Sequence, residues 1–65
     1  MPFKCCFDIY WSVNMMTNED WVQDFASVTD AEEWAAKYAD ELVITSDGRL
    51  THKDIVWWVE EYHNG

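Results

Sequence analysis

Alternation of apolar and polar side chains along residues 3–13 constrains the fold of this chain more than any other feature. Every second position is apolar: Phe3, Cys5, Phe7, Ile9, Trp11 and Val13. The positions between them include Lys4, Asp8 and Ser12, with Cys6 and Tyr10 as exceptions. Because successive side chains of a strand point to opposite faces, this period of two predicts a strand with one buried face. Cys6 and Tyr10 interrupt its polar face, which indicates that a helix or a partner partly covers this second face.

Residues 14–19 are expected to be a connection. Residues 18–26, which overlap its end, fit either a strand or a helix. Helical spacing is shown by Trp21, Val22, Phe25 and Val28, and strand spacing by Trp21, Gln23 and Phe25. Two overlapping capping boxes begin directly afterwards, at Ser27 and at Thr29, and they would interrupt a continuous helix. We therefore favour a second strand before Ser27 and a new helix after it.

The segment after these capping boxes has the spacing of an amphipathic helix. Its apolar positions recur at intervals of three and four residues: Ala31, Trp34, Ala35, Tyr38 and Leu42. Lys37 lies four residues from both Glu33 and Glu41, so we expect it to pair with them. Beyond the helix, the β-branched run 43–45 predicts a short third strand, and Asp47-Gly48 predicts a turn.

The last segment is predicted to be a second helix that starts at Thr51. Thr51 and Asp54 have the spacing of a capping box, and Leu50 and Ile55 that of a hydrophobic staple. The buried stripe of this helix would be Ile55, Trp58, Val59 and Tyr62. The element order is then ββαβα. It predicts an α+β fold: one small domain over residues 1–65, with a three-stranded, mainly antiparallel sheet in the order 2-1-3 and two helices.

Net charge excludes several kinds of partner. The chain has 13 acidic and 4 basic residues among 65, a formal net charge of −9. Direct binding of DNA, RNA or an anionic membrane needs a basic surface, so we expect none of these. Repulsion among so many carboxylates destabilises a compact fold, and solubility alone needs less charge. The sequence therefore favours a positively charged partner, and large basic grooves belong mostly to proteins that hold nucleic acid.

Candidate catalytic and metal-binding residues are poorly placed in this sequence. His52 and His63 lie eleven positions apart, and no nucleophile has an evident base beside it. Cys5 and Cys6 are adjacent, which suits neither a disulfide between them nor the usual spacing of a zinc site. We expect reduced thiols, no enzyme activity, no metal and no cofactor. With no apolar signal segment in Met1-Pro2-Phe3-Lys4 and no membrane span, a cytoplasmic protein is expected.

Candidate partner-binding residues lie on the two predicted helices. Trp57 is of special interest because it lies about 200° around the last helix from Ile55, on the face expected to be solvated. Tryptophan is enriched among the residues that dominate binding energy at protein interfaces. We expect the following residues to contact a partner: Asp30, Glu32, Glu33, Asp40, Asp54, Trp57, Glu60 and Glu61.

A resemblance exists at the level of a functional class. The stretch 25–35, Phe-Ala-Ser-Val-Thr-Asp-Ala-Glu-Glu-Trp-Ala, resembles the strand-to-helix passage of small phage proteins. Small size and strong acidity resemble phage-encoded anti-CRISPR and anti-restriction inhibitors. That resemblance implies an anti-CRISPR protein that mimics nucleic acid and blocks a CRISPR effector subunit, or a restriction nuclease. The alternative is an interaction module that binds a host protein, such as RNA polymerase, through an exposed aromatic patch.

Overall fold

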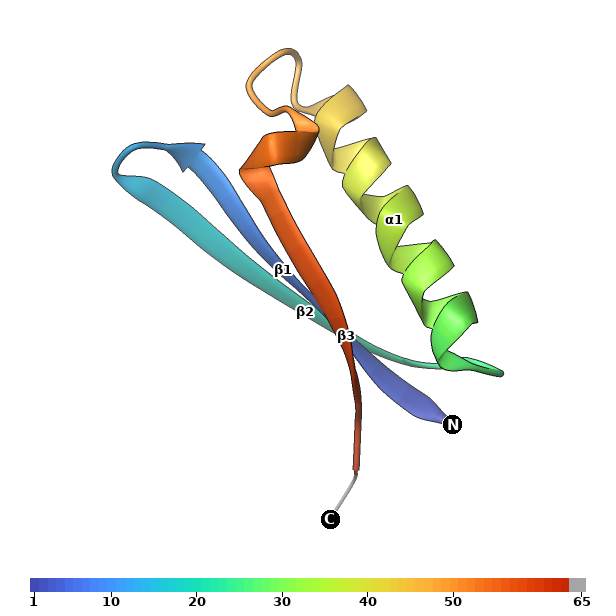
Figure 1. The fold of residues 1–65 in the computed structure, drawn as a ribbon. Coiled ribbons are helices and arrows are strands. Elements are labelled where there is room, and N and C mark those ends of the chain that lie inside the picture. Colours follow the sequence, from blue (N-terminus) through green and yellow to red (C-terminus); the bar gives the residue numbers. More distant parts are fainter. Residues whose placement is uncertain (64–65) are drawn as a thin grey trace.

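A computed structural model describes residues 1–63 as three strands and one long helix. The elements are β1 (Pro2–Ser12), β2 (Met15–Asp24), α1 (Val28–Thr45), a 3-10 turn (His52–Asp54) and β3 (Ile55–Glu61). Figure 1 shows α1 running alongside the sheet, with the 3-10 turn leading from its far end into β3.

The sheet has the order β2-β1-β3, and both pairs are antiparallel. β1 and β2 form a hairpin around Val13 and Asn14, so the connection is shorter than the predicted 14–19. β3 pairs with the other edge of β1, from Phe3 opposite Glu61 to Ile9 opposite Ile55. The α+β class and the sheet order 2-1-3 are confirmed, and so is the strand over the ambiguous residues before Asp24.

Two elements in the second half of the chain differ from the sequence prediction. Residues 43–45, predicted as a strand, form the last turn of α1. The segment after Thr51, predicted as a helix, forms only a 3-10 turn before it becomes strand β3. The domain therefore has one α-helix rather than two, and its third strand comes from Ile55–Glu61.

The ends of α1 are closed by two serines. Ser27 is the N-cap residue, as predicted, and its Oγ accepts a hydrogen bond of 3.3 Å from the backbone N–H of Asp30. At the other end the buried Ser46 donates to the carbonyl of Val43 and accepts from the N–H of Leu50. Asp47 and Gly48 follow with positive φ of 57° and 84°, which confirms the predicted turn. These contacts extend the helix through its β-branched residues.

The hydrophobic core lies between α1 and one face of the sheet. β1 contributes four buried side chains: Phe3, Cys5, Phe7 and Ile9. α1 contributes Ala31, Ala35 and Ala39, which repeat every four residues and are at most 4% exposed. Because alanine carries only a methyl group, this stripe places the helix backbone close to the sheet.

An aromatic cluster fills the space between α1 and β2. It consists of Phe7, Trp21, Trp34 and Tyr38. Tyr38 is its centre: its ring centroid lies 4.8 Å from that of Phe7, 5.4 Å from Trp34 and 5.9 Å from Trp21. The Tyr38 hydroxyl also donates to a carboxylate oxygen of Glu19 on β2. This cluster therefore holds the helix to the hairpin edge of the sheet.

Candidate functional site

The acidic residues predicted on the first helix lie on the exposed side of α1. Asp30, Glu32 and Glu33 are exposed in its first two turns. Asp40 is exposed too, but its Oδ1 lies 2.7 Å from Nε2 of His52 in the 3-10 turn. A protonated His52 would offset part of the negative charge of Asp40. Helical spacing alone could not show this contact, because His52 lies outside α1.

Two other predicted partner-binding residues have structural roles. Asp54 accepts a hydrogen bond of 2.8 Å from the backbone N–H of Thr51, which is the predicted capping box. The capped element is the 3-10 turn and not the predicted second helix. Trp57 was expected on a solvated helix face. Instead it lies on β3 opposite Phe7, is half-buried and packs against the core. The neighbouring Trp58, expected to be buried, is exposed.

Glu60 and Glu61, which were expected to share one helix, lie on opposite faces of β3. Glu61 is on the face that carries α1, opposite Phe3, and its Oε2 lies 3.9 Å from Nε2 of His63. Glu60 is on the other face, opposite Lys4, and accepts a hydrogen bond of 2.6 Å from the Trp58 indole. The predicted residues therefore do not form one surface.

The carboxylates are not neutralised by lysine or arginine within residues 1–63. Over this range the ion-pair contacts are the two histidine pairs, Asp40 with His52 and Glu61 with His63. The predicted pairing of Lys37 with Glu33 and Glu41 is therefore absent from the described structure. Arg49 instead lies over the ring of Trp11, 5.5 Å from its centroid. The formal charge of −9 thus acts outward, with little internal compensation.

The face of the sheet away from α1, which we call the open sheet face, was missed by the sequence interpretation. Its residues occupy alternate positions of all three strands: Pro2, Lys4, Cys6, Asp8 and Tyr10 of β1, Met16, Asn18, Asp20, Val22 and Asp24 of β2, and Val56, Trp58, Glu60 and Tyr62 of β3 or its end. The missed signal is the continuous run of β-branched and aromatic residues over 55–59, Ile-Val-Trp-Trp-Val, a composition typical of a strand.

Apolar side chains are unusually exposed on the open sheet face. The exposed fractions are 47% for Val22, 49% for Val56, 40% for Trp58 and 37% for Tyr62. In the centre Cys6 is only 3% exposed, with Asp20 on one side and Trp58 on the other. Cys6 is thus covered by its neighbours on this face, while those neighbours themselves remain open to solvent.

Carboxylates surround these apolar residues and make the open sheet face negative. Asp20 and Asp24 line its β2 edge, Glu60 its β3 edge, and Asp8 its central strand. Burial, together with the negative charges of Asp20 and Glu60 and against the opposing charge of Lys4, raises the pKa of the Cys6 thiol from 9.0 to about 11. The field at the centre of this face is therefore negative.

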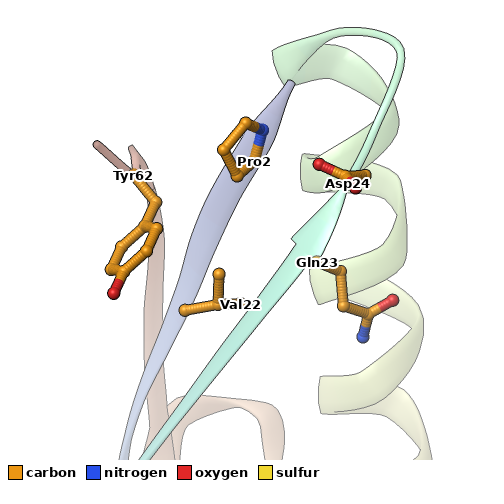
Figure 2. Close-up of a pocket in the computed structure, with 5 residues that line it drawn as sticks. All are labelled: Pro2, Val22, Gln23, Asp24 and Tyr62. Carbon is orange, nitrogen blue, oxygen red and sulfur yellow. The ribbon is translucent and has the colours of Figure 1, made fainter. Parts of the chain in front are cut away.

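A hollow of about 290 Å³ lies at one end of the open sheet face. It is lined by Pro2, Val22, Gln23, Asp24 and Tyr62. In Figure 2 the Tyr62 ring and Val22 lie on the same side of the sheet as Pro2, whereas Gln23 points away from them. The lining therefore combines three largely apolar side chains with the carboxylate of Asp24 and the amide of Gln23, and such a lining can accommodate a long cationic side chain.

A second hollow, of about 320 Å³, lies beside the aromatic cluster and is lined by Trp34, Lys37, Tyr38 and Glu41. Burial and the hydrogen bond to Glu19 raise the pKa of Tyr38 to about 12. The phenol therefore stays protonated at neutral pH and acts as a donor that joins α1 to β2.

Chemistry-bearing groups of other kinds are dispersed in residues 1–63. No three histidine, cysteine or acidic side chains in this range come together in a way that could hold a metal ion. Cys5 and Cys6 are both buried and unbridged. The described helix is not long and apolar enough to cross a membrane.

Comparison of the chain with protein-family models, with curated proteins and with solved structures finds no match.

Proposed function

We propose that this protein is a non-enzymatic inhibitor that mimics nucleic acid and blocks DNA binding by a basic effector. An anti-CRISPR protein acting on an effector subunit in the host cytoplasm is the preferred instance, and an anti-restriction protein the next. The observation that supports this proposal is the set of carboxylates without lysine or arginine partners over residues 1–63, on a chain of net charge −9. Such a surface presents to a basic channel the same sign of charge that a phosphate backbone presents.

Competition with DNA for a purified effector tests the proposal. A Cascade-type complex, a Cas9-type complex and a restriction endonuclease are each mixed with labelled cognate DNA, and DNA release is measured by fluorescence anisotropy. We expect one of them to lose DNA as the protein is added, with an apparent Kd for DNA that rises in proportion to the protein concentration. An effector that holds DNA and this protein in one ternary complex would contradict mimicry.

The second candidate is a protein–protein interaction module that uses an aromatic patch. The exposure of Val56, Trp58 and Tyr62 on one sheet face favours it. Salt separates the two functions, because charge-driven affinity falls steeply between low and moderate ionic strength and aromatic burial changes little. Titrations at several salt concentrations on the same effector therefore distinguish them.

A further inference from the structure

We infer that the open sheet face is the surface that docks on the basic partner, and that its hollow receives an arginine side chain. The class of partner rests on the proposed function. The surface itself rests on the arrangement of Val22, Trp58, Tyr62 and Asp24, which is independent of any particular target.

The open sheet face is suited to docking because it exposes apolar side chains. On a sheet face that stays in water, polar side chains normally occupy such positions. An antiparallel sheet with one face in water usually alternates apolar and polar positions cleanly. Here Val22, Val56, Trp58 and Tyr62 all project from the solvated side, each more than a third exposed. They lie on both edges of the sheet around the buried Cys6, so one partner surface could cover them together.

Charge identifies what covers this face. Its carboxylates are Asp8, Asp20, Asp24 and Glu60, and the cation among them is Lys4. A second copy packed on the same face would bring two such sets together, on chains that each carry −9. A partner with clustered positive charge instead gains attraction at each carboxylate. The occupant is therefore a basic protein surface rather than another copy of this chain.

The hollow at Pro2 fits the side chain of an arginine from that surface. Tyr62 and Pro2 offer apolar contact to its methylene stem, and Val22 closes the hollow beside them (Figure 2). Asp24, opposite Pro2 in the register of β1 and β2, supplies a carboxylate for the guanidinium. A carboxylate can accept two parallel N–H bonds from guanidinium but only a point contact from an ammonium.

Trp58 and Glu60 favour arginine over lysine at a second position of the same face. The indole N–H of Trp58 donates to Glu60 at 2.6 Å, so a carboxylate is held beside an exposed aromatic ring. Guanidinium stacks on aromatic rings while it pairs with carboxylates, and it sheds water more easily than ammonium does. Arginine-rich probes should therefore bind this face more tightly than lysine-rich probes of equal charge.

Mapping a basic probe onto the surface of the full chain tests the inference. The isotope-labelled protein is titrated with an octa-arginine peptide, and amide and indole shifts are followed by NMR. We expect the shifts to concentrate at Val22, Asp24, Trp58 and Tyr62, with weaker shifts from an octa-lysine peptide. Shifts confined to α1, or spread evenly over all carboxylates, would overturn the inference.

A matched pair of variants separates local contact from overall charge. The first variant, Asp20→Asn with Asp24→Asn, removes two charges from exposed positions on the open sheet face. The second variant, Glu32→Gln with Glu33→Gln, removes two charges from exposed positions on α1. We expect the first to weaken octa-arginine binding at least about fivefold, and the second less than about twofold, because a distant exposed charge is screened. Equal weakening by both variants would refute a specific site on the sheet. Circular dichroism of each variant checks that it is folded.

The outcomes distinguish this inference from the proposed function. If octa-arginine maps to the open sheet face but no effector loses DNA, nucleic-acid mimicry fails and the docking surface stands. If an effector loses DNA while octa-arginine maps to α1, mimicry stands and the docking surface is wrong. Sedimentation of the free protein completes the test, because a dimer broken by Trp58→Ser would assign the face to a second copy.

Discussion

Truncation of Tyr38 at the centre of the aromatic cluster should remove most of the stability of this domain. Tyr38→Ala removes ring contacts with Phe7, Trp34 and Trp21, and the hydrogen bond to Glu19. Each aromatic pair contributes roughly 0.5–1.5 kcal/mol beyond its buried area. A hydrogen bond to a charged group contributes about 1.5–3 kcal/mol, and the low end applies because both partners are half-buried.

These contributions add to roughly 3–6 kcal/mol for Tyr38→Ala and about 1.5 kcal/mol for Tyr38→Phe, which loses the hydroxyl alone. Single domains have about 0.05–0.15 kcal/mol of stability per residue, or roughly 3–10 kcal/mol for a chain of this size. The alanine variant should therefore be unfolded or nearly so at 25 °C, whereas the phenylalanine variant should remain folded with a lower urea midpoint.

Urea unfolding followed by tryptophan fluorescence measures both effects. A double-mutant cycle of Tyr38→Phe and Glu19→Gln should show strong non-additivity, because the two changes remove the same hydrogen bond. The reasoning is refuted if Tyr38→Ala is as stable as Tyr38→Phe, since the ring contacts would then contribute nothing. Additive effects in the cycle would refute the assignment of the hydrogen bond.

Four further predictions concern the cap, the thiols and the helix carboxylates. Ser27→Ala should cost about 1 kcal/mol of unfolding free energy in urea titrations, through loss of the N-cap bond to α1. Cys5 and Cys6 should react with a chromogenic disulfide reagent at pH 8 only after unfolding, because both are at most 3% exposed. Because the pKa of Cys6 is raised from 9.0 to about 11, its contribution to stability is complete below pH 9.0 and is lost as the pH rises through about 11. The free energy of unfolding should therefore fall less steeply with rising alkaline pH in Cys6→Ala than in the unaltered protein. Glu32→Lys with Asp40→Lys should leave the melting temperature within a few degrees and slow association with a basic partner by at most about fourfold, without faster dissociation in kinetic binding assays.

Most of the first half of the fold could be predicted from sequence because the signals on either side of the ambiguous residues 18–26 each have one interpretation. The alternation over 3–13 admits no helix, and Ser27 is followed by a helix in which Ala31 and Ala35 repeat with helical spacing. In the second half the signal is ambiguous. The continuous apolar run 55–59 fits a helical stripe as well as a strand of β-branched and aromatic residues, and only pairing with the free edge of β1 decides for the strand.

The predicted site residues failed to converge for the same reason. Placing residues 55–61 on a helix put Trp57 in solvent and Trp58 in the core, and the change to a strand exchanges them. It also separates Glu60 from Glu61. The contact of Asp40 with His52 depends on the path of the chain after α1, which no local pattern specifies.

Under the proposed function, the acids of α1 and the mixed apolar and acidic groups of the open sheet face would contribute differently to competition with nucleic acid at physiological salt. Screening limits the field of an exposed carboxylate to about 8 Å, so the acids on α1 act mainly on the approach to a basic partner and contribute little once the complex forms. A competitor of DNA also has to stay bound, and lifetime depends on groups that lose water in the contact. Under the proposed docking, those groups would be Val56, Trp58 and Tyr62 of the open sheet face, with Asp24 and Glu60 on the same face to select positive charge. Acidity alone would give a fast and weak encounter, and the exposed sheet residues are what would make it persist.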